Sequence, residues 1–306
     1  MTLKTDTRKP ASSRGRKRGP WTRYRESFMR SGLSREASTY ISIGVALVGV
    51  ALTLGPIGYL ILGGFRDLHQ FTADPAGLPD PLLFKNYAGI LGKSLFWRQL
   101  FNSTFVAAGT VLGVVVFGTM AAYPLARYRF KGREALYVVF ATGLMFPLSV
   151  AILPLYLMLH DMDLIGNYLG LILPQVAFGL PVTILIMRPF IAALPKELEE
   201  AAFIDGVTRV GYFWRILLPL ARPGMVTVGV LAFIGSWNSY LLPLLLLTGD
   251  QSSMTLPLGV TAFKGQYASD MTAIMAYTSL SMIPALIFFV FMERRIVEGL
   301  TGAVKG

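Results

Sequence analysis

Long apolar stretches, each free of Asp, Glu, Lys, Arg and His, dominate the pattern of hydrophobic and polar positions along this chain. A hydrocarbon core of about 30 Å needs about 20 apolar residues of helix to cross it, so only stretches of that length are candidates. Six stretches are long enough, at 37–65, 99–126, 135–159, 164–187, 223–249 and 271–292. The pattern therefore predicts an all-α integral membrane protein with six transmembrane helices.

The expected helices lie inside these stretches and contain interior prolines. Their predicted bounds are Tyr40–Leu62, Ser103–Ala126, Leu136–Leu159, Ile165–Met187, Gly224–Leu247 and Thr272–Met292. Prolines such as Pro147, Pro181 and Pro284 free backbone groups that neighbouring helices or water must satisfy, which favours kinked helices packed in a bundle. We expect residues 37–306 to form one transmembrane domain and residues 1–36 to be a disordered basic tail.

The composition agrees with a membrane protein, because 54% of the residues are hydrophobic and only 15% are charged. The absence of cysteine excludes disulfides, thiol catalysis and Cys-type metal sites. His69 and His160 are the only histidines and lie far apart in the sequence, so no metal site is expected. Gly92-Lys93-Ser94 resembles the end of a phosphate-binding loop, but Tyr87 stands where that loop needs a glycine. We therefore expect no bound cofactor and no catalytic site.

The placement of Lys and Arg predicts the orientation in the membrane. The net charge is +11, and 23 of the 28 Lys and Arg lie in the tail 1–36, the loops 127–134 and 188–222, and the C-terminal tail. Positive residues stay on the cytoplasmic side, so both termini and the loop 188–222 are expected there. Residues such as Arg16 could bind nucleic acid or anionic lipid, but no aromatic platform accompanies them. A disordered topogenic tail without a nucleic-acid partner is favoured.

The loop 188–222 carries the signals of two short helices. Pro195 and the glutamates that follow it suit the first turn of a helix, and Gly206 suits its C-terminal cap, which predicts a helix over about residues 195–205. Thr208 can cap a second helix, which Pro219 separates from the fifth span.

This predicted pair of helices offers contacts to another protein. Glu200 can present a carboxylate to a basic partner, and the small Ala201 and Ala202 leave room for a groove to close over one face. Four aromatic residues can act as apolar anchors: Phe203, Tyr212, Phe213 and Trp214. The alternative is an amphipathic helix-turn-helix that lies on the bilayer without a partner.

The spacing of the loop carries a family resemblance. Glu200, Ala201 and Ala202 are followed by Gly206 and then by Ile216, Leu218 and Pro219. This arrangement resembles the EAA loop of ABC importer permeases, which docks on the ATPase subunit. The resemblance implies a type I ABC importer permease fold, with a cytoplasmic coupling helix formed by Glu200, Ala201, Ala202, Phe203 and their neighbours.

Softer motifs narrow the resemblance to one group of importers. They are Asn102-Ser103, Tyr123-Pro-Leu-Ala-Arg127, Trp237-Asn-Ser-Tyr-Leu-Leu-Pro243 and the tail Gly299–Gly306. Together they resemble the second permease of carbohydrate-uptake ABC importers of the maltose-transporter type. The resemblance implies a cell-membrane subunit for sugar or oligosaccharide import. It also implies a homologous second permease, a dimer of ATPase subunits that bind ATP and Mg, and an extracytoplasmic sugar-binding protein.

The densest polar patch within a predicted span is Ser236, Trp237, Asn238 and Tyr240. Amide and hydroxyl groups beside aromatic rings suit a sugar path, but interhelical hydrogen bonding also explains the patch and is slightly favoured. The spans contain no ionisable group of the Asp, Glu, Lys, Arg or His kind, which argues against a proton relay. Two alternatives to a sugar importer remain open: an ABC permease for a non-sugar solute, and an ion-coupled or passive membrane protein.

Overall fold

The computed structural model describes residues 35–247, 249–263 and 270–304, and every regular element in these ranges is helical. The predicted tail at 1–36 lies almost wholly outside the described residues. The chain divides into two units between Pro56 and Ile57. The described part of the first unit is the beginning of α2 (Arg35–Gly64), and its apolar side chains are exposed, as at Tyr40 and Leu52. Such a surface needs lipid or another protein chain as its environment.

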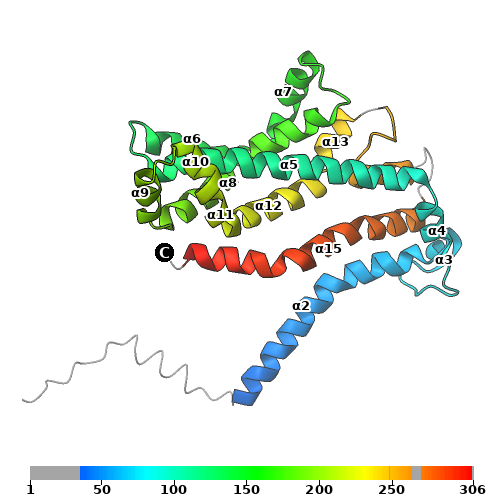
Figure 1. Ribbon diagram of the computed structural model, residues 1–306. Helices are drawn as coiled ribbons and strands as arrows, with labels where there is room; N and C mark the ends of the chain where they lie inside the picture. The colour runs from blue at the N-terminus through cyan, green and yellow to red at the C-terminus, as the bar shows by residue number, and fades with distance from the viewer. Residues whose placement is uncertain (1–34, 248, 264–269, 305–306) are drawn as a thin grey trace, which may run out of the picture. The chain divides into compact units, whose positions relative to one another are not determined.

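The second unit is built around α5 (Ser94–Arg127). This helix packs along α8 (Tyr168–Ala193) and against α12 (Arg222–Trp237), and α12 packs in turn against α15 (Met271–Val304) (Figure 1). The approach of α5 to α8 requires glycine, because a Cβ at Gly113 would lie 2.5 Å from a methyl group of Val176. Small residues let helix backbones approach closely, which is how helices associate in lipid.

Six membrane spans are present among the described residues if each bent helix pair counts as one. Four helices are long and apolar enough to cross a membrane alone, namely α2, α5, α8 and α15. The pair α6 (Arg133–Gly143) and α7 (Leu148–Asp161) is bent by 98° at its break. The pair Arg209–Leu220 and α12 is bent by 77°. The prediction of an all-α membrane fold is confirmed, with four to six apolar spans by length and composition, and the second bent pair includes part of the loop 188–222 that was predicted to lie outside the membrane.

The prediction of one continuous third helix, Leu136–Leu159, is wrong. The chain leaves the helix after Gly143 and starts α7 at Leu148, with Pro147 in an extended conformation at φ −73° and ψ 132°. Proline has no N–H for a helical hydrogen bond, and it disfavours helical backbone in the residue before it. The proline thus separates two helices rather than kinking one.

The prediction of one fifth helix, Gly224–Leu247, is also wrong. The helix α12 ends at Trp237, and α13 (Leu241–Leu246) begins after a break. Pro243 cannot donate a hydrogen bond to the carbonyl of Ser239, so a continuous helix would lack that bond. Asn238 is therefore the C-terminal cap of α12 and not a mid-helix residue. Its exposed side chain donates from Nδ2 to the Ile234 carbonyl at 3.0 Å, within its own helix.

The first turns of α5 fix the segment between α13 and α14 (Leu256–Gly259) through neutral hydrogen bonds. Asn102 Nδ2 donates to the carbonyls of Ser252 at 2.8 Å and Met254 at 3.0 Å, and Ser103 Oγ accepts from the Leu256 amide at 2.7 Å. Both side chains are buried. At this end of the second unit lie the short helices α3 (Leu68–Ala73), α4 (Lys85–Leu91) and η2 (Val260–Phe263).

Candidate functional site

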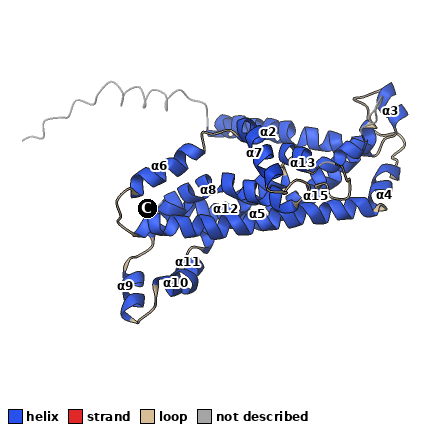
Figure 2. Cartoon of the chain, turned by 90° about the horizontal axis from the view of Figure 1, so that it is seen from above, coloured by secondary structure: helices blue, strands red, loops and turns tan. Residues whose placement is uncertain are grey.

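The other end of the second unit carries a helical hairpin, which we call the 197–220 hairpin (Figure 2). Gly206 turns the chain between its limbs at φ +79°, and the Thr208 Oγ1 accepts a hydrogen bond from the Gly211 amide at 3.1 Å. Both predicted helix ends are therefore confirmed. The elements of the hairpin are α9 (Glu197–Ile204), α10 (Arg209–Tyr212), the π-helical turn η1 (Phe213–Leu217) and α11 (Leu218–Leu220).

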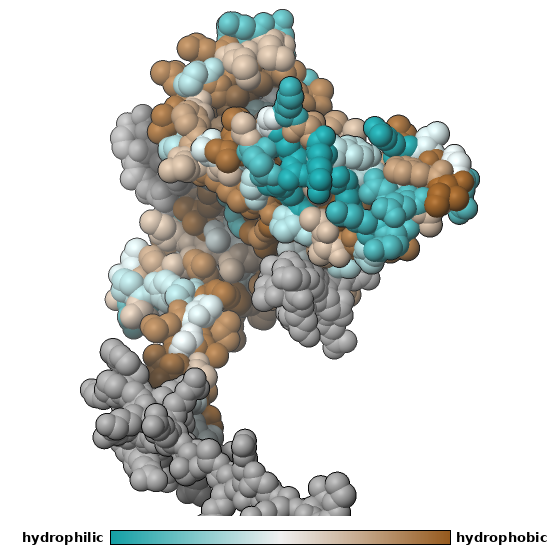
Figure 3. Space-filling view, turned by 90° about the vertical axis from the view of Figure 1, so that its left-hand side faces the viewer, coloured by the Kyte–Doolittle hydropathy of each residue, from teal (hydrophilic) through white to brown (hydrophobic). Residues whose placement is uncertain are grey.

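The helix α9 has an outer and an inner face. Glu200, Ala201 and Phe203 are exposed, as is Gly206 just beyond the helix. Ala202 is buried, so the expectation that both alanines face outward is wrong for this residue. Figure 3 views this end of the molecule and shows polar residues gathered on it beside apolar surface. The outer face of α9 is free within this chain to contact another protein.

The second limb of the hairpin has a buried face and an exposed face. Tyr212 and Phe213 are buried in an apolar cluster with Met187 and Ile191, so their predicted role as anchors for a partner is wrong. Rings of this size bury large apolar areas and fix the limb to the bundle. The side chain of Trp214 is 50% exposed. The remaining residues of the predicted docking set lie on this limb, with Ile216 and Leu218 half-buried and Pro219 exposed.

A buried polar contact joins α9 to the last turn of α5. Tyr123 donates from its hydroxyl to Glu199 Oε1 at 2.8 Å, and Arg127 Nε lies 3.6 Å from Glu199 Oε2. Arg127 Nη2 also donates to the carbonyl of Leu194, the C-cap residue of α8, at 2.8 Å. The sequence interpretation gave Glu199 only a helix-dipole role and so missed this contact. The available signal was the four-residue spacing of Tyr123 and Arg127, which places both on one helix face.

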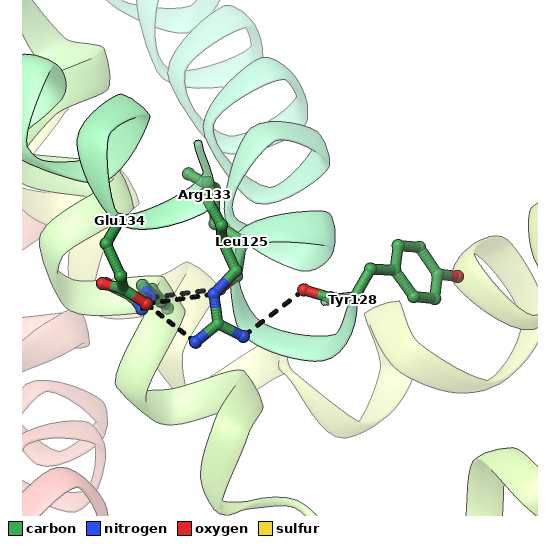
Figure 4. A network of polar contacts seen from close by, with 5 residues as sticks. Leu125, Tyr128, Arg133 and Glu134 are labelled. Carbon is green, nitrogen blue, oxygen red and sulfur yellow. Dashed lines mark hydrogen bonds and ion pairs between the residues drawn. The ribbon is translucent and has the colours of Figure 1, made fainter. Parts of the chain in front are cut away.

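Tyr128 extends this contact towards α6 and α10. Its hydroxyl donates to the Tyr123 hydroxyl at 2.8 Å, and the Arg209 guanidinium lies 5.0 Å from the centre of its ring. Its carbonyl accepts from Arg133 Nη1 at 3.3 Å, and Arg133 pairs with Glu134 at 2.7 Å (Figure 4). The end of α5 is thus joined to α6, α9 and α10.

A groove of about 500 Å³ lies between α12 and α15, and two residues of the predicted sugar path line it. They are Trp237 and Asn238, and Thr278 and Ser281 contribute hydroxyl groups from α15. The indole Nε1 of Trp237 donates to the Ser281 carbonyl at 3.3 Å. The groove therefore combines an aromatic ring, an amide and hydroxyls, the groups that the sequence interpretation associated with a sugar.

The structure does not bring the other two predicted path residues to this groove. Ser236 Oγ is buried and makes no hydrogen bond to the described part of the chain, and Tyr240 packs against an apolar cluster that contains Leu242 and Leu246. Among the described residues, no group of three or more His, Cys, Asp or Glu could hold a metal ion.

The structure is a bundle of apolar helices with a helical hairpin at one end, and the helices can supply up to six spans. These features define a multi-pass membrane protein with a candidate docking surface. Residues 114–299 match the family described as "Binding-protein-dependent transport system inner membrane component". The chain belongs to this family and is a permease of the ABC importer class.

Two relatives show how far the similarity extends. The chain is 38% identical to the trehalose transport system permease protein SugB of Mycobacterium tuberculosis, over 89% of this chain and 99% of that protein. It is 34% identical to the diacetylchitobiose uptake system permease protein NgcG of Streptomyces coelicolor, over 84% of this chain and 85% of that protein. Both alignments reach far beyond the hairpin.

Solved structures support the same fold. The chain is similar to one chain of a bacterial ABC transporter involved in the import of the acidic polysaccharide alginate, with a TM-score of 0.71 and 24% identity. The similarity covers 86% of this chain and 98% of that chain. At 24% identity this comparison supports a conclusion about the fold alone. The predicted type I ABC importer permease fold is confirmed.

Proposed function

We propose that this chain is a membrane permease of an importer for a sugar or oligosaccharide. The names of its relatives support this substrate class, because they include uptake proteins for trehalose, diacetylchitobiose and arabino-oligosaccharides. In this proposal a homologous second permease completes the translocation path. An extracytoplasmic sugar-binding protein delivers the sugar. Two ATPase subunits bind ATP and Mg and supply the energy.

The observation that carries the proposal is the two-faced geometry of α9. Its outer face presents Glu200, Ala201 and Phe203, while its inner face holds Glu199 and Ala202 against the bundle. An exposed carboxylate beside small and aromatic side chains suits a partner groove that carries a basic residue. A helix fixed on one side can also pass a movement from its partner to the bundle, whereas a helix lying free on a bilayer cannot.

Within this proposal the groove between α12 and α15 contributes to the sugar path. Asn238 would contact the passing sugar, because its exposed amide can form hydrogen bonds with a neutral polyol, whereas Trp237 is buried and would shape the wall of the groove from behind. The groove has no charged lining residue, in keeping with an uncharged substrate.

The proposal is tested with the complete transporter, assembled from this chain, the second permease, the ATPase and the binding protein. We expect the ATPase to co-purify with the permease pair, and one of three probe sugars to stimulate ATP hydrolysis in proteoliposomes. The probes are trehalose, diacetylchitobiose and an arabino-oligosaccharide. Failure of the ATPase to co-purify would contradict the docking role. Stimulation by an amino acid or a peptide instead of these sugars would contradict the substrate class.

We further propose that the 197–220 hairpin faces the cytoplasm, as the distribution of Lys and Arg indicates. The chain has no cysteine, so single cysteines can report the side of the membrane. Asp205→Cys and Asp161→Cys make a matched pair, because both residues are exposed acidic positions. An impermeant thiol reagent added to intact cells should label Asp161→Cys and spare Asp205→Cys. The reverse pattern would overturn the orientation.

A further inference from the structure

The attachment of α9 to the bundle depends on very few side chains. Only Glu199 and Ala202 of this helix are buried. The alanine methyl offers little apolar area, so its burial contributes weakly to holding the helix. The polar contacts of Glu199 with Tyr123 and Arg127 therefore tie the inner face of α9 to the end of α5, beside the contact of the Phe203 ring with the Tyr212 ring, whose centres lie 5.9 Å apart.

Arg127 restrains α9 in a second way. Its Nη2 donates to the carbonyl of Leu194, in the linker that joins α8 to α9. One guanidinium thus holds the linker through a hydrogen bond and α9 through the ion pair with Glu199. The side chain of Arg127 is 2% exposed and that of Glu199 is 11% exposed, so water screens the pair little.

The ion pair between Glu199 and Arg127 leaves some hydrogen-bonding groups of Arg127 without a partner, so it is expected to contribute little to the stability of the fold. Arg127 Nε and Nη1 are buried and have no hydrogen-bond partner among the residues that the structure describes. Well-packed apolar residues in place of a buried ion pair often give equal or greater stability. A buried charged pair does, however, fix one geometry at the expense of others, because any other arrangement leaves a charge without its partner.

We infer that Glu199 and Arg127 are positioning residues that set the angle of the coupling helix on the end of α5. Through them a movement of α5 reaches the outer face of α9 and the ATPase docked there. This inference rests on the proposed docking function, since it assigns the residues that make docking productive. Glu200 contacts the ATPase in this scheme, and its neighbour Glu199 contacts the permease's own bundle.

The test uses the complete transporter in proteoliposomes with Glu199→Gln, which keeps an acceptor for Tyr123 but removes the charge facing Arg127. Tyr123→Phe is the milder second variant. Glu197→Gln is the matched control, because Glu197 is an exposed carboxylate on the same helix. We expect each Glu199 and Tyr123 variant to retain the ATPase and its basal hydrolysis. Stimulation by the binding protein with the active probe sugar should fall about tenfold, a typical size for coupling between sites.

The outcomes separate this inference from the docking proposal. If the unmodified chain retains no ATPase, both the docking proposal and the positioning role of Glu199 and Arg127 are wrong. If it retains the ATPase and Glu199→Gln is stimulated like Glu197→Gln, docking stands and the positioning role is overturned. A loss that disappears after correction for the amount of folded complex, measured by thermal melting, would also overturn it, because Glu199 would then serve stability alone.

Discussion

The two ends of α5 hold their neighbours by different chemistry. Near its start, Asn102 and Ser103 bond the backbone of the segment before α14 with neutral groups at 2.7 to 3.0 Å. Near its end, Tyr123 and Arg127 hold α9 through a carboxylate, and the ion pair is 3.6 Å long. Bonds to backbone carbonyls at ideal length make a fixed anchor. The longer charged contact leaves two guanidinium nitrogens of Arg127 without a hydrogen bond among the described residues, and it fixes the angle of α9 because any other arrangement would separate the two charges.

The largest expected effect is at the turn of the 197–220 hairpin. Gly206→Pro is incompatible with φ +79°, since proline fixes φ near −65°, and it removes the amide that donates to the Phe203 carbonyl. We expect transport to be abolished while the protein still inserts in the membrane. Transport is measured as sugar uptake into vesicles at matched expression. Gly206→Asn is the control and should retain most uptake, because asparagine tolerates left-handed backbone.

The next prediction concerns the outer face of α9. Glu200 is exposed, so Glu200→Lys should leave the melting temperature unchanged. It should repel the basic partner groove and remove the ATPase from the purified complex. The matched control is Glu197→Lys, an exposed glutamate at the start of the same helix. Equal retention of the ATPase by both variants would contradict the role of Glu200 as the residue that contacts the ATPase.

At the start of α5 we expect a loss of stability without a loss of coupling. Asn102→Ala leaves the carbonyls of Ser252 and Met254 without their donor in a buried site, at a cost of about 1–3 kcal/mol. The melting temperature should fall, while uptake per folded transporter stays at the wild-type level. If Asn102→Ala instead lowered uptake per folded transporter and left the melting temperature unchanged, the start of α5 would act in coupling, and the contrast with the end of α5 would be wrong.

The smallest expected effect on transport is at Asn238. Its amide is exposed and bonds only its own helix, so Asn238→Ala should leave melting almost unchanged. If Asn238 lines the sugar path, the ranking of the probe sugars in the ATPase assay should change. A lower melting temperature with an unchanged sugar ranking would instead assign Asn238 to helix packing.

The positions at which helices break within the apolar stretches could not be predicted from the sequence, for a physical reason. The length of an apolar stretch shows whether a helix could cross the membrane. It does not show whether a proline within the stretch kinks the helix or ends it. Pro181 lies within the continuous helix α8, whereas Pro147 separates α6 from α7. Neighbouring helices can satisfy the backbone groups that a proline frees, and their positions follow from the tertiary packing.

By itself, the sequence determined the class of this protein. Charge-free stretches of sufficient length indicated an all-α membrane protein, and the residues of the loop predicted its turn at Gly206, while the importer class came from the resemblance of the Glu200–Pro219 motif to a known family. These properties depend on local periodicity and on backbone preferences, which neighbouring residues carry. The tertiary structure decided which side chains of that loop face outward. Glu199 and Glu200 are adjacent and chemically identical, yet only packing against α5 makes one of them buried and leaves the other free for a partner.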